Sequence, residues 1–540
     1  MVYALLFAMA LCAPADLVVE NARIWTGDAA GFASFLAVRD GRFVHVGDPR
    51  PDLIGPRTER IDAEGRVVLP GFIDSHIHML NGGMNLSQLQ LRDAASKEEF
   101  IQRVRDWAAS LPEGKWILGG RWSTESWAVV EQPTKEWVDE ASQGHPLYLS
   151  RMDGHSALVN SVALRMAGIT KDTPNPPGGV IDKDPRTGEP TGILRETAMG
   201  LVSRLIPPPT IEEKVEALRR AMREANQVGI TSVCDIPSFS DLPVYERLAA
   251  EGDLTVRFLL YPTADDWSEA IRRLATWRGK EGWVEVQGFK AYFDGSLGSR
   301  TAWMSKPFLN NPADQPNWAG LPMPIVTDGT FLRNARAAAA GGYQVIVHAI
   351  GDEANRVLAK QLLDVYGSRE MLRRARPRSE HAQHLAPDVV SAFGNLGIIA
   401  SMQPYHKADD GRYAEEYIGA ERCAWSYAYR KLLNAGAVVA FGSDWPVVTQ
   451  NVFLGLEAAV DARILNGKIW FPEERLPITE ALRGYTTSAA YACFMESEIG
   501  RIAPGYRADF QVLNGSPFAN EVRWQEIRPV QVFVEGKRVL

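Results

Sequence analysis

Eight apolar runs rich in β-branched residues recur between residues 71 and 494, separated by stretches dominated by Ala, Leu, Arg and Glu. Such an alternation is typical of a parallel sheet covered by helices. The runs are GFIDSHIHM, ITSVCDI, TVRFLLYP, EVQGFKAYF, YQVIVHAI, RSEHAQHL, GIIASMQP and AVVAFGSDW. Eight is the strand number of a closed TIM barrel, so we predict an α/β fold with a (β/α)8 barrel over residues 71–494.

The two ends of the chain have a different sequence pattern. Residues 17–70 and 495–540 contain short alternating strands separated by Gly and Asp turns, which predicts one small β domain assembled from both termini. Residues 112–210 are rich in Trp, Pro and Gly and match none of the strand–helix units. We interpret them as an insertion between the first and second barrel strands, which we expect to cover the barrel mouth. The tryptophans between 107 and 137 could line an aromatic pocket, although core packing is their commoner use.

The composition excludes some classes of protein. The 540 residues carry a formal net charge of −8, and no run of Lys and Arg rises above background, which argues against nucleic-acid binding. The four cysteines are widely spaced and predict neither a zinc ribbon nor a disulfide scaffold. No apolar stretch is long enough for a membrane span.

The N-terminus suggests a targeting segment. Residues 1–16 contain an apolar stretch of signal-peptide length followed by small residues, but no Lys or Arg precedes it. The alternative is a first buried strand. We favour the signal peptide, and with it a periplasmic or secreted protein rather than a cytoplasmic one.

Polar side chains stand near the ends of five of the eight runs. His76 and His78 end the first run, and residues i and i+2 of a strand face the same side, where two imidazoles could share a metal ion. The other runs contribute Lys290, His348, His381 and Asp444. Each has an ordinary explanation, such as a satisfied core histidine, a lysine that reaches solvent or an aspartate that caps a helix. Because the carboxyl ends of barrel strands meet at one mouth, their recurrence favours one shared site.

These segments also carry a family resemblance. LPGFIDSHIH, FKAYFDGSLGSRTA, VHAIGD, SEHAQ, FGSDWPV and IAPGYRADF resemble the amidohydrolase superfamily, and within it the amidohydrolase family 3 branch that contains the N-substituted formamide deformylases. The resemblance runs from about residue 17 to the C-terminus. It implies a metal-dependent hydrolase in which a distorted TIM barrel sits beside a β-sandwich built from the two chain ends.

The resemblance also implies a role for each site residue. His76 and His78 would hold one divalent ion, and His348 and His381 the other, with zinc as the expected metal. Lys290 would bridge the ions as a carbamate formed with carbon dioxide, because burial and neighbouring cations favour its neutral amine. Asp444 would contact a metal and the attacking water. With a single ion, Lys290 would instead be a plain amine that donates hydrogen bonds. His384, which follows His381 by three positions, is expected to face elsewhere.

We therefore predict hydrolysis of a non-peptide C–N bond in a small-molecule amide or formamide. A metal-dependent esterase, lactonase or deaminase on the same barrel is an alternative. A non-catalytic binding relative would be missing metal ligands, and none is missing. Candidate substrate-binding residues are His155, Arg195, Asp294 and Arg300. The first two lie in the insertion, where a loop held by its own hydrogen bonds explains them equally well. We also allow for a homodimer.

Overall fold

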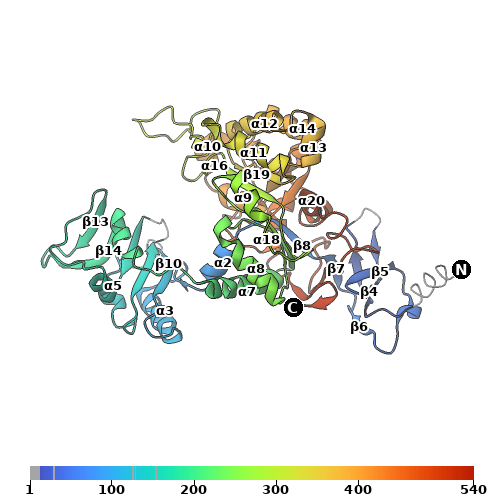
Figure 1. The fold of residues 1–540 in the computed structure, drawn as a ribbon, viewed down its shortest axis with the longest axis horizontal. Coiled ribbons are helices and arrows are strands. Elements are labelled where there is room, and N and C mark those ends of the chain that lie inside the picture. The colour runs from blue at the N-terminus through green and yellow to red at the C-terminus, as the bar shows by residue number, and fades with distance from the viewer. Residues whose placement is uncertain (1–12, 28–30, 125–126, 128, 130, 152–154) are drawn as a thin grey trace. The chain divides into compact units, whose positions relative to one another are not determined.

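The computed structural model describes residues 13–27, 31–124, 127, 129, 131–151 and 155–540 (Figure 1). The chain divides into two compact units, one containing Leu80–Arg220 and the other containing the residues up to Met79 together with Ala221–Leu540. The apolar run of the predicted signal peptide, residues 1–12, lies outside the described residues. Within the described part of the chain, no helix is both long and apolar enough to cross a bilayer.

Parallel strands form the centre of the larger unit. They lie in two sheets, with the orders β17-β16-β15-β8 and β18-β19-β20-β21-β22. Every neighbouring pair is parallel. The strands are β8 (Phe72–Ile77), β15 (Ile230–Asp235), β16 (Arg257–Leu260), β17 (Val284–Val286), β18 (Gly288–Tyr292), β19 (Gln344–Ala349), β20 (Arg378–His381), β21 (Ile399–Met402) and β22 (Val439–Phe441).

All eight predicted runs contain one of these strands, and the fourth run is divided between β17 and β18. The segment after β22 lies beside β8, because the Asp444 N–H donates to the His76 carbonyl at 2.7 Å. The His78 N–H likewise donates to the Trp445 carbonyl at 2.9 Å. Closure of the two sheets into one barrel remains a prediction from the strand number.

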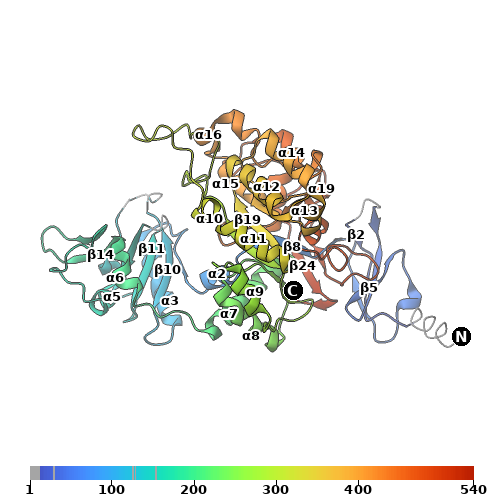
Figure 2. The ribbon, with the colours of Figure 1, turned by 45° about the horizontal axis from the view of Figure 1, so that its top comes forward.

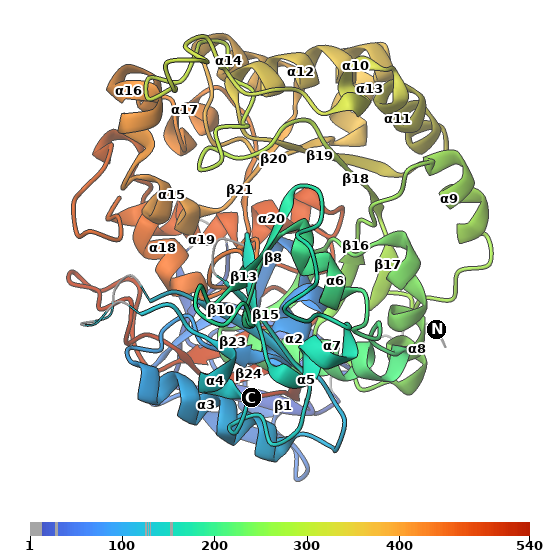
Figure 3. The same cartoon turned by 90° about the vertical axis from the view of Figure 1, so that its left-hand side faces the viewer.

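Helices of the same unit cover these sheets. Helices α11 and α12 contact β19, and Figures 2 and 3 show them beside that strand. Helix α12 illustrates why these segments are helical: Asp352 and Glu353 lie in its first turn, Leu358 and Leu362 are buried, and Gly367 ends it in the left-handed conformation at φ 71°. The helices are α8 (Leu242–Glu251), α9 (Trp267–Leu274), α10 (Pro324–Thr327), α11 (Thr330–Ala340), α12 (Asp352–Tyr366), α13 (Arg369–Ala375), α14 (Pro387–Leu396), α15 (Pro404–Asp410), α16 (Ala414–Cys423), α17 (Tyr429–Asn434), α18 (Val452–Val460), α19 (Ile478–Gly484) and α20 (Thr487–Ala492).

Strands from both chain ends share a sheet. β23 pairs antiparallel with β7, so that Phe510 lies opposite Pro70. Two sheets result, with the orders β5-β4-β1-β6 and β25-β24-β23-β7-β2-β3, and their apolar residues form one hydrophobic cluster. The strands are β1 (Leu17–Glu20), β2 (Arg23–Trp25), β3 (Phe32–Ala33), β4 (Phe35–Arg39), β5 (Arg42–Gly47), β6 (Glu59–Asp62), β7 (Val67–Pro70), β23 (Phe510–Leu513), β24 (Pro529–Val534) and β25 (Lys537–Arg538).

The smaller unit has a sheet of its own, with the order β13-β14-β12-β11-β10-β9. It begins at Leu80 rather than at the predicted residue 112, because the apolar face of α3 packs in one cluster with β10 and β11. Trp127 and Trp137 stack 6.3 Å apart in that cluster, so these rings serve core packing. The elements from Met79 to Gln227, of which α2 and α7 extend beyond the bounds of this unit, are α2 (Met79–Leu86), β9 (Leu89–Gln90), α3 (Lys97–Ser110), β10 (Ile117–Trp122), α4 (Lys135–Val138), β11 (Leu147–Arg151), β12 (Ser156–Val159), α5 (Ser161–Met166), β13 (Gly179–Lys183), β14 (Pro190–Glu196), α6 (Gly200–Ser203) and α7 (Ile211–Gln227).

Candidate metal centre and catalytic pocket

The carboxyl ends of the parallel strands of the larger unit surround one cavity of about 400 Å³. Its lining includes all six of the polar residues predicted from the strand ends, which are His76, His78, Lys290, His348, His381 and Asp444. Asp444 follows β22 and adopts φ 59°, and His381 ends β20 at φ 79°. These left-handed conformations are strained for residues other than glycine, and strain of this kind concentrates at functional sites.

Histidine rings lie side by side across this cavity. The ring centroids of His76 and His381 are 4.7 Å apart, and those of His381 and His348 are 4.5 Å apart. The Oδ1 atom of Asp444 lies 3.3 Å from Nε2 of His76 and 3.2 Å from Nε2 of His78. The ring nitrogens and this carboxylate therefore converge on one small space.

A buried ion pair supports His76 from behind. Glu380 Oε2 lies 2.5 Å from His76 Nδ1, and Arg378 Nε donates to Glu380 Oε1 at 2.7 Å. Burial alone would raise the pKa of Glu380, but Arg378 and His76 hold that pKa well below its usual range. Since the carboxylate can only accept, His76 carries its hydrogen on Nδ1 and presents the Nε2 lone pair to Asp444.

That arrangement fits a bound cation. Burial and the neighbouring Lys290 lower the pKa of His76, so its ring is neutral. Two acceptor atoms, His76 Nε2 and Asp444 Oδ1, then face each other at 3.3 Å, which is repulsive unless a cation lies with them. Imidazole nitrogens with a carboxylate oxygen form a donor set that suits zinc. Two groups of three ligand atoms lie within 4.8 Å of one another: His76, His78 and Asp444, and His381, His406 and Asp444.

Lys290 is buried among these ligands. Its Nζ has no hydrogen-bond partner among the described residues and lies 4.9 Å from the centroid of the Tyr292 ring. Burial lowers the pKa of Lys290 to about 8, although the Glu380 and Asp444 carboxylates oppose the shift. A neutral amine is the form that reacts with carbon dioxide, so the environment suits the carbamate that the resemblance implies.

Two contributors to the site were not predicted. His406 lies in α15, just after β21, and its ring stacks on that of His381 at 6.2 Å and 5°. Gln403 accepts from His381 Nδ1 at 2.8 Å. The signal was present in QPYH, which overlaps the end of the seventh run and places polar groups at a sixth strand end.

The other candidate residues near the strand ends have structural partners. Asp294 accepts backbone N–H groups of Trp303, Ile350 and Gly351 at 2.8–2.9 Å, and burial raises its pKa to about 7. Its carboxylate also lies 3.6 Å from His348 Nε2, so it supports the end of β19. Arg300 donates to the Asn310 carbonyl at 2.8 Å. His384 lies 2.7 Å from Ser426 and is not among the cavity-lining residues, as expected.

His155 and Arg195 belong to the smaller unit. His155 Nδ1 lies 3.1 Å from Glu196 Oε1, and Arg195 Nη2 lies 2.7 Å from Asp182 Oδ2. Both side chains are exposed. These local ion pairs match the structural explanation given above, and a substrate role for either residue remains a prediction.

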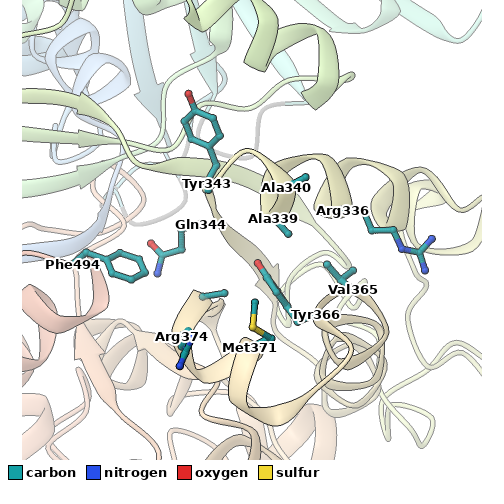
Figure 4. A pocket seen from close by; sticks show the side chains of 12 residues that line it. Arg336, Ala339, Ala340, Tyr343, Gln344, Val365, Tyr366, Met371, Arg374 and Phe494 are labelled. Atoms are coloured by element: carbon teal, nitrogen blue, oxygen red, sulfur yellow. The ribbon is translucent and has the colours of Figure 1, made fainter.

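A second cavity, of about 560 Å³, lies between α11, α12, α13 and Phe494 (Figure 4). It adjoins Gln344, at the amino end of β19, whereas His348 stands near the carboxyl end of that strand. Its lining contains no histidine, cysteine or carboxylate. The cavity at the strand ends is therefore the candidate catalytic pocket.

Neutral imidazoles, a carboxylate and a buried lysine at the ends of parallel strands define a centre of the metal-dependent hydrolase type. The chain belongs to the amidohydrolase family, whose model matches residues 59–540. It is 38% identical to Protein LONG AFTER FAR-RED 3 of Arabidopsis thaliana, over 97% of this chain and 91% of the relative. It is 26% identical to the N-substituted formamide deformylase of Arthrobacter pascens, over 96% of this chain and 97% of that protein. The crystal structure of an uncharacterized metal-dependent hydrolase from Pyrococcus horikoshii OT3 is similar at a TM-score of 0.75 and 27% identity, over 94% of this chain and 99% of that one.

Proposed function

We propose that this protein hydrolyses a non-peptide C–N bond in a small-molecule amide or formamide. The observation that carries the proposal is the opposition of His76 Nε2 and Asp444 Oδ1 at 3.3 Å within a row of neutral histidines, which calls for a divalent ion. Family membership supports the reaction class, and the name of the Arthrobacter relative supports formamides as substrates.

The described residues suggest how metal would be held. His76 and His78, which lie with Asp444 in one group of ligand atoms, would bind one ion. His381 and His348, whose rings are 4.5 Å apart, would bind a second, with zinc as the preferred metal and a Lys290 carbamate between the two. A bound ion of this kind polarises a carbonyl and lowers the pKa of water towards neutrality. Asp444 would complete the set, because its Oδ1 atom faces both His76 Nε2 and His78 Nε2.

Asp444 is also the group best placed to move a proton. Its Oδ1 atom lies 3.3 Å from His76 Nε2 and 3.2 Å from His78 Nε2, beside the proposed ion and therefore beside the attacking water. It would take a proton from the attacking water and deliver it to the leaving nitrogen, since an amine cannot depart as an anion. The products are a carboxylic acid and an amine.

The outer part of the cavity suits a small organic substituent. Tyr292 and Val447 are exposed at its edge, with Leu297 and Val448 also in the lining. A volume of about 400 Å³ matches a small molecule rather than a folded protein.

A panel of matched substrates tests the proposal. Zinc-replete protein is assayed with N-alkylformamides, N-acyl amides, the corresponding esters, lactones and an aminopurine. We expect the formamides or amides to have the highest kcat/KM, and chelation followed by zinc addition to abolish and restore turnover. Faster ester hydrolysis or deamination would assign the site to that reaction instead. Turnover unaffected by thorough chelation would contradict a metal-dependent mechanism.

Export and homodimer formation are also proposals. Mature protein recovered from its native cell should begin after about residue 16, and light scattering should give twice the chain mass. An intact Met1 or a monomeric mass would contradict the respective proposal.

A further inference from the structure

Five histidine rings line the catalytic cavity. The hydrogen-bond partner of each ring indicates which of its two nitrogens carries the hydrogen. A neutral imidazole has one N–H donor and one lone pair, on different nitrogens. Where one nitrogen faces a group that can only accept, that nitrogen carries the hydrogen, and the other offers a lone pair. Where it faces an N–H donor, the assignment reverses.

Four of the five rings offer a lone pair at their second nitrogen. Nδ1 of His76 faces the Glu380 carboxylate at 2.5 Å, and Nδ1 of His78 faces the Ile236 carbonyl at 3.3 Å. His348 is turned the other way, with Nε2 3.0 Å from the Gly295 carbonyl, so Nδ1 holds its lone pair.

His381 completes that set of four. Its Nδ1 faces Gln403 Oε1 at 2.8 Å. The orientation of the Gln403 amide is fixed by its own Nε2, which donates to the Ser401 carbonyl at 3.3 Å. These four rings are thus prepared to bind metal through His76 Nε2, His78 Nε2, His348 Nδ1 and His381 Nε2.

His406 is the exception. Its Nδ1 lies 3.0 Å from Gln383 Nε2, an amide N–H donor, so Nδ1 holds the lone pair and Nε2 carries the hydrogen. That Nε2 is buried and has no hydrogen-bond partner among the described residues; the nearest carboxylate oxygen, Asp444 Oδ2, is 3.7 Å away. A buried donor facing the cavity without an acceptor is one that a ligand would satisfy.

We propose that His406 is a catalytic residue that donates its Nε2–H to the substrate carbonyl oxygen, and that it is not a metal ligand. The proposal rests on the hydrolase function proposed above. As water attacks, negative charge builds on that oxygen, and a donor fixed in a buried site stabilises it more than the uncharged carbonyl. The stack on His381 holds the donor beside a ligand ring without competing for metal.

Zinc content distinguishes a histidine that binds metal from one that donates a hydrogen bond to the substrate. In His406→Ala we expect the full zinc complement by elemental analysis, kcat lowered about 10²–10³-fold, and KM changed much less. His406→Asn, whose amide can donate, should recover part of the loss. His76→Ala serves as the reference for a ligand and should lose zinc. His45→Gln, in β5 of the sandwich region, is the control and should match wild type.

Ring tautomers give a readout that needs no substrate. Long-range ¹H–¹⁵N spectra are recorded on zinc-loaded protein with ¹⁵N-labelled histidine, and the His406 signal is identified as the one missing from His406→Asn. In the wild-type protein this signal should show hydrogen on Nε2 only. Gln383→Met should return this ring to a mixture of tautomers and lower kcat about tenfold. If wild-type His406 carries its hydrogen on Nδ1, or if His406→Ala loses zinc as His76→Ala does, the proposal is wrong. The tautomer and zinc measurements need no substrate, so they test the role of His406 even if no amide in the panel is hydrolysed. A panel without any amide substrate would count against the hydrolase proposal instead.

Discussion

Glu380 and His76 form a hydrogen bond of 2.5 Å in which neither side chain has any exposure to solvent. Arg378, equally buried, holds the other oxygen of Glu380 and also donates to the Ser75 carbonyl. The guanidinium, the carboxylate and the imidazole therefore form one connected chain that ends at the candidate metal centre. Groups that hold a metal ligand in this way commonly tune affinity as strongly as the ligands themselves.

We expect Glu380→Gln to weaken zinc binding about 10–100-fold, because the amide no longer fixes the His76 tautomer. It should also lower the free energy of unfolding of the metal-free protein by about 3–5 kcal/mol, since Arg378 would keep a buried charge without its partner. Zinc titration and denaturant unfolding measure the two effects. Glu496→Gln, which removes the partly exposed partner of Arg376, is the matched control and should cost at most about 1 kcal/mol. Unchanged zinc affinity in Glu380→Gln would count against the tuning role.

Asp444→Asn should separate chemistry from metal binding. The amide cannot accept the proton of the attacking water, so kcat should fall about 10²–10⁴-fold while much of the zinc is retained. Elemental analysis and steady-state kinetics on the same preparation provide the measurement. Asp388→Asn alters a surface carboxylate paired with Arg356 and should behave as wild type. Near-normal kcat in Asp444→Asn would remove this residue from the mechanism.

Lys290→Ala tests the bridging carbamate. Two dications held close together repel, and a negative bridge offsets part of that repulsion. Zinc content should fall from two ions towards one, and turnover should nearly vanish. Added acetate or propionate should partly restore both, because a free carboxylate can occupy the space that the buried side chain leaves. A variant that keeps its full metal content and ignores carboxylates would show that Lys290 is only a neighbour of the ions.

Lys407 gives a pH-dependent prediction outside the metal ligands. Its buried Nζ has no hydrogen-bond partner among the described residues, and burial lowers its pKa from 10.5 to about 8. Between these values the unfolded chain binds more protons, so the free energy of unfolding should rise with pH through this window, by up to about 3 kcal/mol. Lys407→Met should remove that rise and be more stable at pH 7. In this variant Glu474 still pairs with Lys431 and still accepts the Arg430 N–H, so the substitution leaves no buried carboxylate without a partner.

Denaturant unfolding at pH 7 and pH 10 measures the effect, with the exposed Lys360→Met as control. Lys290 also makes the free energy of unfolding rise with pH, but it does so equally in the wild type, in Lys407→Met and in Lys360→Met. An unchanged pH slope in Lys407→Met would show that this lysine is solvated in the folded protein.

Much of this architecture is visible in the sequence because apolar β-branched runs mark buried parallel strands, and His76, His348 and Asp444 stand where such runs end. Partnerships across the structure are not visible there. Glu380 precedes His381 by one residue, yet it serves His76, which lies 304 positions earlier. His406 comes from a helix rather than a strand, so a search limited to strand ends passes over it. The start of the smaller unit at Leu80 depends on α3 packing with β10, which no local pattern encodes.

The pairing of β7 with β23 has a consequence for synthesis. Gln511 Nε2 donates to the Pro70 carbonyl across 441 positions of the chain. At typical elongation rates the first strands therefore wait about 20–90 s after leaving the ribosome before their partner strands emerge. Throughout that interval β7 can pair with β2, but its other edge has no partner. Any chain that stops before about residue 510 leaves that edge open to chaperones or to aggregation.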